Sequence, residues 1–190
     1  MMYLSNAVSD TVLAVVCIVA FFRFFARQPI YNRILWGTFL VTTALAAAAG
    51  VFRYLGVDTL VDTHRSLSTL AGSVGLVAVV VAIWALVMRQ SMSKSVLVVA
   101  AVIGLLLFVA LLDPVYAVFS PVIQAFTMLL VMLIAVFGLM KKYQKAIWIV
   151  IGVMIIGLAT KVVSNHLPLN PTDVYHYALA AMILCFGKAV

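Results

Sequence analysis

Residues 95–112 read SVLVVAAVIGLLLFVALL, an unbroken apolar stretch that is closed by Asp113 and Pro114. A helix needs about 20 predominantly apolar residues (range about 17–25) to cross the roughly 30 Å of hydrocarbon in a bilayer. This stretch is long enough and contains no charged side chain that would have to remain hydrated. It therefore predicts a membrane-spanning α-helix, and the lack of a strong polar group inside it favours a helix that faces lipid.

Six further apolar runs flank this stretch and are separated by short polar joints. The fifth span starts at Pro114 or at Pro121, and Pro121 is favoured because proline suits a first helical position. With that choice, the predicted spans are residues 4–25, 33–55, 63–88, 95–112, 121–140, 146–163 and 172–187. Seven spans use nearly all of the 190 residues, so we expect one all-α domain, residues 1–190, that forms a polytopic seven-helix bundle.

The composition excludes a water-soluble globular fold. Hydrophobic residues make up 67% of the chain and charged residues 9%, whereas soluble domains are about 45–50% apolar and about 25% charged. The net charge of +7 does not indicate a nucleic-acid partner, because the basic residues stand singly or in pairs at helix ends. We expect the lipid bilayer as the partner and a multi-pass location in a cell membrane, most simply a bacterial cytoplasmic membrane.

The charges separate according to the joints that they occupy. Alternate joints and the C-terminus are basic, with Arg23, Arg27, Arg33, Arg89, Lys94, Lys141, Lys142, Lys145 and Lys188. The acidic residues occupy the other joints and the nearby helix ends, as Asp10, Asp58, Asp62, Asp113 and Asp173. Because cytoplasmic loops carry an excess of Lys and Arg, this pattern predicts an outside N-terminus and a cytoplasmic C-terminus.

Ionisable side chains collect in the predicted outer half of the bundle. Burying such a group in hydrocarbon costs roughly 2.5–3.5 kcal/mol on insertion scales, so those that remain there usually pair or serve a function. The candidate ligand-binding residues are Asn6, Asp10, Arg53, Lys161, Asp173 and His176. Asn6 and Asp10 are four residues apart and share a helix face, as do Asp173 and His176, which are three apart.

Two interpretations of this cluster remain open. In one, the side chains line an outer cavity in which Arg53 and Lys161 recognise an anionic group on a lipid or small ligand. In the other, they are hydrated interfacial groups, and the ion pairs Asp10–Arg53 and Asp173–Lys161 lock the bundle.

Metal binding and catalysis receive less support from the residues. The histidines are His64, His166 and His176, and zinc takes three or four ligands in tetrahedral geometry. No His-x-x-x-His or Cys-x-x-Cys pair occurs, so a zinc site at these histidines is a minor alternative. No catalytic residue stands out, because serines in membrane helices are usually packing residues.

The segment Asn170-Pro-Thr-Asp-Val-Tyr-His176, the pair Ser9-Asp10 and the small-residue run that ends near Gly50 resemble a superfamily of seven-helix membrane hydrolases. That superfamily, often called CREST, includes the alkaline ceramidases and the progestin and adipoQ receptors. The resemblance implies zinc held by one His of helix 2 and two of helix 7, with a Ser and an Asp nearby. Here only His176 carries over, because Arg53 stands at the helix-2 position and Ala180 stands four residues after His176. The resemblance therefore implies a non-catalytic or differently catalytic member.

The sequence leaves several functions open. The leading hypothesis is a divergent relative of these hydrolases whose outer cavity binds a small ligand or lipid. The alternatives are a proton or ion channel or transporter, with Asp10, Lys161 and His176 as relay groups, and a zinc-dependent membrane hydrolase. Whether the protein is an enzyme, whether it holds a cofactor such as zinc, and whether it forms a homo-oligomer through its small-residue stripes remain open.

Overall fold

The computed structural model describes residues 2–163 and 170–190, which form helices and joints and contain no strand. In chain order, the elements are α1 (Met2–Ala20), the π-helical turn η1 (Phe21–Phe25), α2 (Ile30–Tyr54), the 3₁₀ turn η2 (Asp58–Leu60), α3 (Val61–Leu70), the π-helical turn η3 (Ala71–Gly75), α4 (Leu76–Val87), α5 (Lys94–Leu112), α6 (Pro114–Ala117), α7 (Ser120–Met140), α8 (Ala146–Val163) and α9 (Pro171–Ala189). The predicted all-α class is confirmed.

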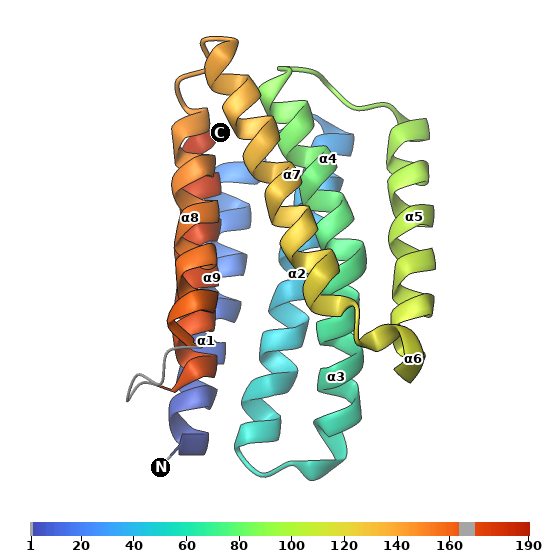
Figure 1. The fold of residues 1–190 in the computed structure, drawn as a ribbon, viewed down its shortest axis with the longest axis vertical. Coiled ribbons are helices and arrows are strands. Elements are labelled where there is room, and N and C mark those ends of the chain that lie inside the picture. Colours follow the sequence, from blue (N-terminus) through green and yellow to red (C-terminus); the bar gives the residue numbers. More distant parts are fainter. Residues whose placement is uncertain (1, 164–169) are drawn as a thin grey trace.

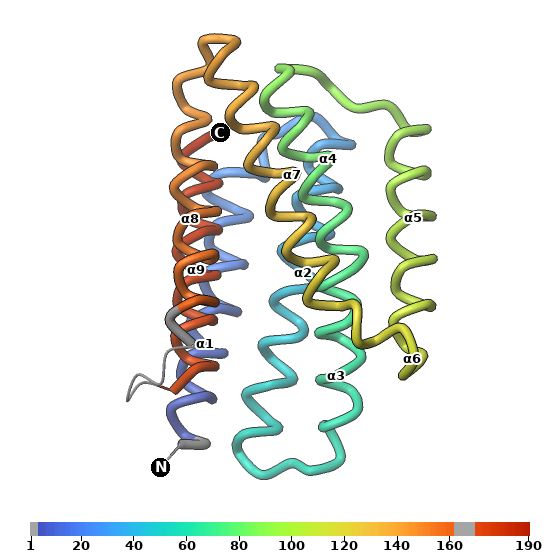
Figure 2. The backbone as a smooth tube through the Cα atoms, viewed as in Figure 1, coloured from blue at the N-terminus to red at the C-terminus, as the bar shows by residue number. Residues whose placement is uncertain are grey.

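The long helices form a bundle and run along its longest axis (Figure 1). Helix α9 packs between α1 and α8, and α2 links α1 to the continuous rod formed by α3, η3 and α4. Helix α7 crosses the bundle and contacts both α4 and α8. Helix α5 stands at the edge, where it packs against η3 and α4 (Figure 2).

Five helical segments are long and apolar enough to cross a membrane among the residues that the structure describes. They are Leu4–Phe25, Ile30–Tyr54, Asp58–Val87, Lys94–Leu112 and Ser120–Met140, and a shorter apolar helix covers Ala146–Lys161. These segments match the first five predicted spans. Several long apolar helices in one bundle are typical of a multi-pass membrane protein.

The joints fall at two opposite ends of the bundle (Figure 1). The joints α1–α2, α4–α5 and α7–α8 lie at one end, together with the C-terminus, and we call this the basic end. The N-terminus and the α2–α3 joint, with Asp58 and Asp62, lie at the opposite end. The alternation of charge along the sequence thus becomes a separation of charge between two ends.

One predicted span begins at a different residue in the structure. Helix α2 begins at Ile30 and not at Arg33, because Pro29 precedes it as the N-cap. The N-cap of α9 is Asn170, whose side chain accepts a hydrogen bond from the Thr172 amide at 3.0 Å, with Pro171 as the first helical residue. Trp36 of α2 belongs to the core, since it is 1% exposed and stacks on Phe25 with 4.2 Å between ring centroids.

Glycines allow the α3–α4 rod to approach its neighbours closely. A Cβ on Gly75 would lie 2.7 Å from Thr42 Oγ1 of α2, and a Cβ on Gly104 of α5 would lie 2.8 Å from Val74 Cα. Both contacts involve η3. This turn therefore holds α2 on one side and the edge helix α5 on the other.

Candidate functional site

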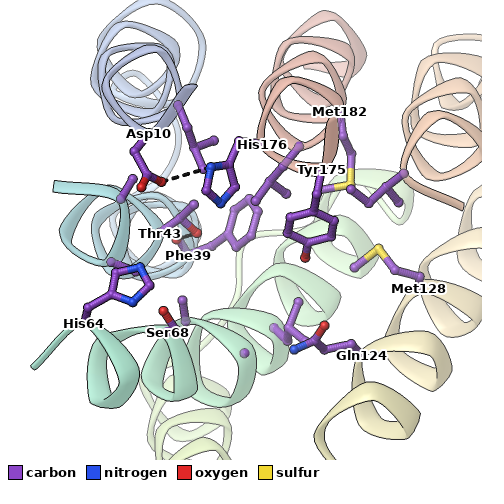
Figure 3. Close-up of a pocket in the computed structure, with 18 residues that line it drawn as sticks. Asp10, Phe39, Thr43, His64, Ser68, Gln124, Met128, Tyr175, His176 and Met182 are labelled. Carbon is purple, nitrogen blue, oxygen red and sulfur yellow. Dashed lines mark hydrogen bonds and ion pairs between the residues drawn. The ribbon is translucent and has the colours of Figure 1, made fainter. Parts of the chain in front are cut away.

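A cavity of about 280 Å³ lies inside the bundle between α1, α2, α3, α7 and α9. Its polar lining consists of Asp10, Thr43, His64, Ser68, Gln124, Tyr175 and His176. The rest of its wall is apolar, from Leu13, Phe39, Leu76, Met128, Ile156, Leu179 and Met182 to the small residues Ala46, Ala47, Ala71 and Gly72. Figure 3 shows Asp10 and His176 facing each other at one side, and Gln124 and Met128 toward the other side.

Small residues create the space for this cavity. Ala46 and Ala47 come from the alanine run of α2, and Ala71 and Gly72 come from the π-helical turn η3. Single π turns inside α-helices are frequent at functional sites. Gly72 is already close to the far wall, because a Cβ there would lie 3.3 Å from Gln124 Nε2.

The central polar contact joins α1 to α9. Asp10 Oδ1 lies 3.0 Å from His176 Nδ1, and Asp10 is 1% exposed while His176 is 15% exposed. Ser9 Oγ approaches the same ring nitrogen at 3.3 Å and donates to Asp173 Oδ1 at 2.6 Å. Asp10 Oδ1 and Ser9 Oγ can each accept a hydrogen bond from Nδ1, so we assign the ring proton to Nδ1 and leave Nε2 of a neutral ring as an acceptor.

A second layer of polar side chains lies behind this contact. The Ser5 hydroxyl donates to Asp173 Oδ2, and the Asn170 amide donates to Asn6 Oδ1. Asn6 and Asp173 are each 8% exposed. These bonds fix the first turn of α9 against α1 and thereby set the position of His176.

Asp10 Oδ2 is the exception in this network. It is buried and has no hydrogen-bond partner among the described residues. Gly50 of α2 faces this carboxylate, because a Cβ at Gly50 would lie 2.8 Å from Asp10 Cγ. An unpaired buried acceptor costs roughly 1–3 kcal/mol, more when it is charged, so its retention requires an explanation.

His64 approaches the same place from α3. A Cβ at Gly50 would also lie 3.0 Å from His64 Nε2, so both side chains converge on this glycine. Arg53 Nη1 lies 3.3 Å from His64 Nδ1, and the Arg53 guanidinium lies 5.3 Å from the centroid of the Tyr54 ring. Because Arg53 is a donor only, His64 Nδ1 must accept, which assigns the ring proton to Nε2.

The predicted ligand-binding residues are therefore not equivalent. Asp10 and His176 line the cavity, whereas Asn6 and Asp173 form the layer behind them. The predicted ion pair of Asp10 with Arg53 does not form, because Asp10 pairs with His176 and Arg53 contacts His64 across the α2–α3 joint.

Two further predicted residues belong to α8 and to the segment that follows it. Lys161, the predicted partner of Asp173, is exposed in the last turn of α8 and is not among the described residues that line the cavity. His166 lies outside the described residues.

No pattern in the sequence indicates that Thr43, Ser68 or Tyr175 lines the cavity. Thr43 and Ser68 resemble many other small polar residues in the spans. Tyr175 precedes His176 directly, and neighbours in a helix do not share a face. Gln124 carried a usable signal, as a lone amide in an otherwise apolar helix, and it does line the cavity.

The geometry limits the chemistry of these groups. In a Ser-His-Asp triad, the serine and the carboxylate contact opposite nitrogens of the imidazole. Here Ser9 and Asp10 both approach Nδ1 of His176, which is not the geometry of an activated serine. Within residues 2–163 and 170–190, no three His, Cys, Asp or Glu side chains are grouped closely enough to hold a metal ion.

A family model described as a family of unknown function, DUF6962, matches residues 5–190. No curated protein and no solved structure matches the chain.

Proposed function

We propose that this chain, which belongs to the DUF6962 family of unknown function, is a seven-span membrane protein whose internal cavity binds a small amphipathic ligand. The N-terminus is outside and the C-terminus is cytoplasmic, and α8 and α9 are the sixth and seventh spans. The basic joints at one end of the bundle support this orientation.

The observation that carries the binding proposal is the unpartnered Oδ2 of Asp10 at the edge of a largely apolar cavity. Polar groups at membrane depth are costly and usually mark a functional site. A ligand that donates a hydrogen bond to Oδ2 removes this cost. The apolar walls then enclose the rest of the ligand.

The volume of the cavity limits the size of the occupant. Ligand pockets typically measure about 300–1,000 Å³, and this cavity, at about 280 Å³, is near the lower limit. It suits a small molecule or one chain of a lipid rather than a complete two-chain phospholipid.

The polar lining favours a hydrogen-bond donor over the anionic group expected from the sequence. The ionised carboxylate of Asp10 accepts only, and His176 Nε2 accepts when the ring is neutral. Arg53, the cation expected to bind an anion, contacts His64 and Tyr54 instead. We therefore propose a hydroxyl or amine head group next to Asp10.

A divergent, non-catalytic relationship to the seven-helix membrane hydrolases remains our proposal for the origin of the fold. Arg53 occupies the position in α2 where the resemblance places an imidazole, and His64 of α3 contacts this arginine. The replacement of an imidazole by the Arg53 guanidinium preserves a polar cluster and changes its chemistry.

The test uses the full chain in nanodiscs of phosphatidylcholine and measures thermal unfolding with 1-decanol or decanoate as the probe. A ligand that binds the folded state raises the unfolding temperature. We expect 1-decanol to raise it for the wild type and much less for Asp10→Asn, whose amide replaces the acceptor Oδ2 by a donor. The control Asp113→Asn changes an exposed carboxylate that caps α6, and it should respond like the wild type.

A second variant, Leu179→Trp, fills the cavity while keeping both Asp10 and His176, and it should also abolish the response. Equal shifts in the wild type and Asp10→Asn, or a larger shift with decanoate than with 1-decanol, would overturn the proposal. Proton flux through the reconstituted wild type that Asp10→Asn abolishes would instead support the transport alternative.

A further inference from the structure

A second pocket, of about 580 Å³, opens at the basic end of the bundle and shares no described lining residue with the cavity. It lies where the α1–α2, α4–α5 and α7–α8 joints meet, and Arg89, Lys142 and Lys145 are in its lining. No Asp or Glu side chain is among the described residues that line it. We call it the basic pocket.

Two of these cations sit in unusual backbone conformations. Arg89 has a φ of 52° and Lys142 a φ of 62°, and in the described part of the chain no other residue except glycine has a positive φ. Each follows the end of a helix in a Schellman-type cap, with bonds from the Gln90 amide to Ala85 O and from the Tyr143 amide to Gly138 O, both 2.9 Å. Glycine is the usual residue at such a position because it avoids the steric cost of a Cβ.

Strained positions that persist in a structure often belong to functional sites. Both strained positions here carry a cation, and both cations line the same pocket. The orientation rule for cytoplasmic loops requires positive charge at this end, but it does not require that charge at two left-handed positions.

Buried side chains hold the wall of the basic pocket in place. Asn32, which is 4% exposed, donates to Gln90 O at 2.9 Å and accepts from the Met92 amide at 2.8 Å. The Arg89 guanidinium lies 5.3 Å from the centroid of the Tyr143 ring, and the Tyr143 hydroxyl donates to Ala189 O. Lys145 is already engaged, since its Nζ donates to Val190 O at 3.0 Å. Arg89 and Lys142 are therefore the cations that remain for a ligand.

An apolar groove adjoins the basic pocket. The groove measures about 510 Å³ and lies between α4, α5 and α7, with Val80, Val81, Trp84, Val96 and Ile134 in its lining. Gln90 and Ser91 line both the pocket and the groove. The basic pocket and the apolar groove thus meet at one short segment.

We propose that the basic pocket and the apolar groove together bind an anionic phospholipid. Its phosphate contacts Arg89 and Lys142, and one acyl chain lies in the groove against Val81 and Trp84. Clusters of Lys and Arg at the cytoplasmic ends of membrane helices attract anionic head groups, and guanidinium and ammonium groups are the donors that phosphate oxygens prefer. This site does not depend on the ligand proposed for the cavity.

The test measures lipid retained by the full chain in mild detergent by native mass spectrometry, with added phosphatidylglycerol or phosphatidylcholine. We expect preferential retention of phosphatidylglycerol by the wild type. The double variant R89Q/K142Q should lower its affinity roughly 25-fold, at roughly fivefold for each charge near an anionic group. The control R27Q/K141Q removes two exposed cations from the same end that do not line the basic pocket, and it should change affinity much less.

Two further variants test two separate points. One distinguishes binding of a lipid from binding of free phosphate, and the other distinguishes a loss of binding from a loss of folding. Val81→Trp fills the groove and should weaken phosphatidylglycerol binding while leaving the response to inorganic phosphate, followed by ³¹P NMR, unchanged. R89G/K142G removes the cations and relieves both left-handed positions, so it should stay folded and still lose the lipid.

If R89Q/K142Q and R27Q/K141Q lost equal affinity for phosphatidylglycerol, binding would depend on the general surface charge and not on this pocket. That result would overturn the proposal. So would equal retention of the two lipids by the wild type. If Val81→Trp kept full phosphatidylglycerol affinity, or if inorganic phosphate bound as tightly as the lipid, the ligand would be free phosphate and not a phospholipid.

Discussion

Gly50 decides, at the scale of a single residue, whether the polar end of the cavity can form. Its Cα faces Asp10 and His64, and a side chain there would lie 2.8 Å from Asp10 Cγ and 3.0 Å from His64 Nε2. These atoms belong to a buried network, so they cannot move away freely. Glycine at this position is therefore a condition for the Asp10–His176 contact.

Gly50→Ala should destabilise the protein by about 1–3 kcal/mol, the usual cost of overpacking a core, and should also abolish the response to 1-decanol. The control is Gly157→Ala on α8, where nothing lies within 4 Å of an added Cβ. That change should be neutral or stabilise by about 0.5–1 kcal/mol, because alanine is the better helix former. Unfolding in nanodiscs measures both, and equal effects of the two substitutions would contradict this role of Gly50.

Tyr143 should make stability depend on pH at the alkaline side. It lies in the α7–α8 joint, where burial raises the pKa of its phenol above the ordinary value of 10.0, against the opposing effect of the Arg89 guanidinium. The folded state therefore keeps this proton at a pH where the unfolded state has lost it. The contribution is complete below about pH 10 and is lost as pH rises through the pKa of the folded state.

Tyr143→Phe removes the bond to Ala189 O and should cost about 1 kcal/mol near neutral pH. Because phenylalanine does not titrate, the stability of this variant should fall less than that of the wild type between about pH 8 and about pH 11. Thermal unfolding followed by circular dichroism measures both profiles. Parallel profiles would show that Tyr143 makes no titrating contribution.

Elements are joined here by a few buried polar side chains. Asn32 is the clearest case, because one side chain of α2 satisfies both Gln90 O and the Met92 amide in the α4–α5 joint. No feature of the sequence distinguished this asparagine from an interfacial residue at the start of a span. Its function depends on a joint almost 60 residues further along the chain.

Asn32→Ala should leave the Gln90 carbonyl and the Met92 amide without their side-chain partner, at a cost of about 1–3 kcal/mol for each group that water cannot reach. Hydrogen exchange of the Met92 amide should accelerate, while exchange in the centre of α7 should not. Gln144→Ala, an exposed change in the α7–α8 joint, serves as the control. Unchanged protection of Met92 in Asn32→Ala would exclude this role.

The two π-helical turns also belong to the element scale. Hydropathy predicts one helix over residues 63–88, and the structure confirms a continuous rod, with η3 inside it. The turn supplies Ala71 and Gly72 to the cavity wall and Gly75 to the contact with Thr42. Hydropathy does not report such a turn, because a π turn changes the bonding of the backbone and not the polarity of its residues.

The whole molecule is organised by the separation of charge between its two ends. We predict that Thr59→Cys, in the α2–α3 joint, reacts with a membrane-impermeant maleimide added to intact cells. Ser91→Cys, in the α4–α5 joint, should react only after the cells are opened. Both positions are exposed, whereas Cys17 is buried and Cys185 is partly buried, so labelling of the wild type measures the native background. The reverse pattern of labelling would invert the proposed orientation.

The sequence by itself determined the all-helical class, the places of the long apolar helices and the separation of acidic from basic joints. It could do so because hydropathy and charge are local properties, and each span meets its requirement within about 20 residues. It also selected Asp10 and His176, since a charged group within an apolar run stands out in any arrangement of the helices.

Only the tertiary structure decided which of these groups meet. Asp10 pairs with His176 and not with Arg53, and His64 enters the cavity from α3. That choice depends on the rotation of each helix about its axis, which is set by close contacts at Gly50 and Gly75 and by the turn η3. His176, the partner of Asp10, lies more than 160 residues away along the chain on α9, and no local pattern encodes a contact over such a separation.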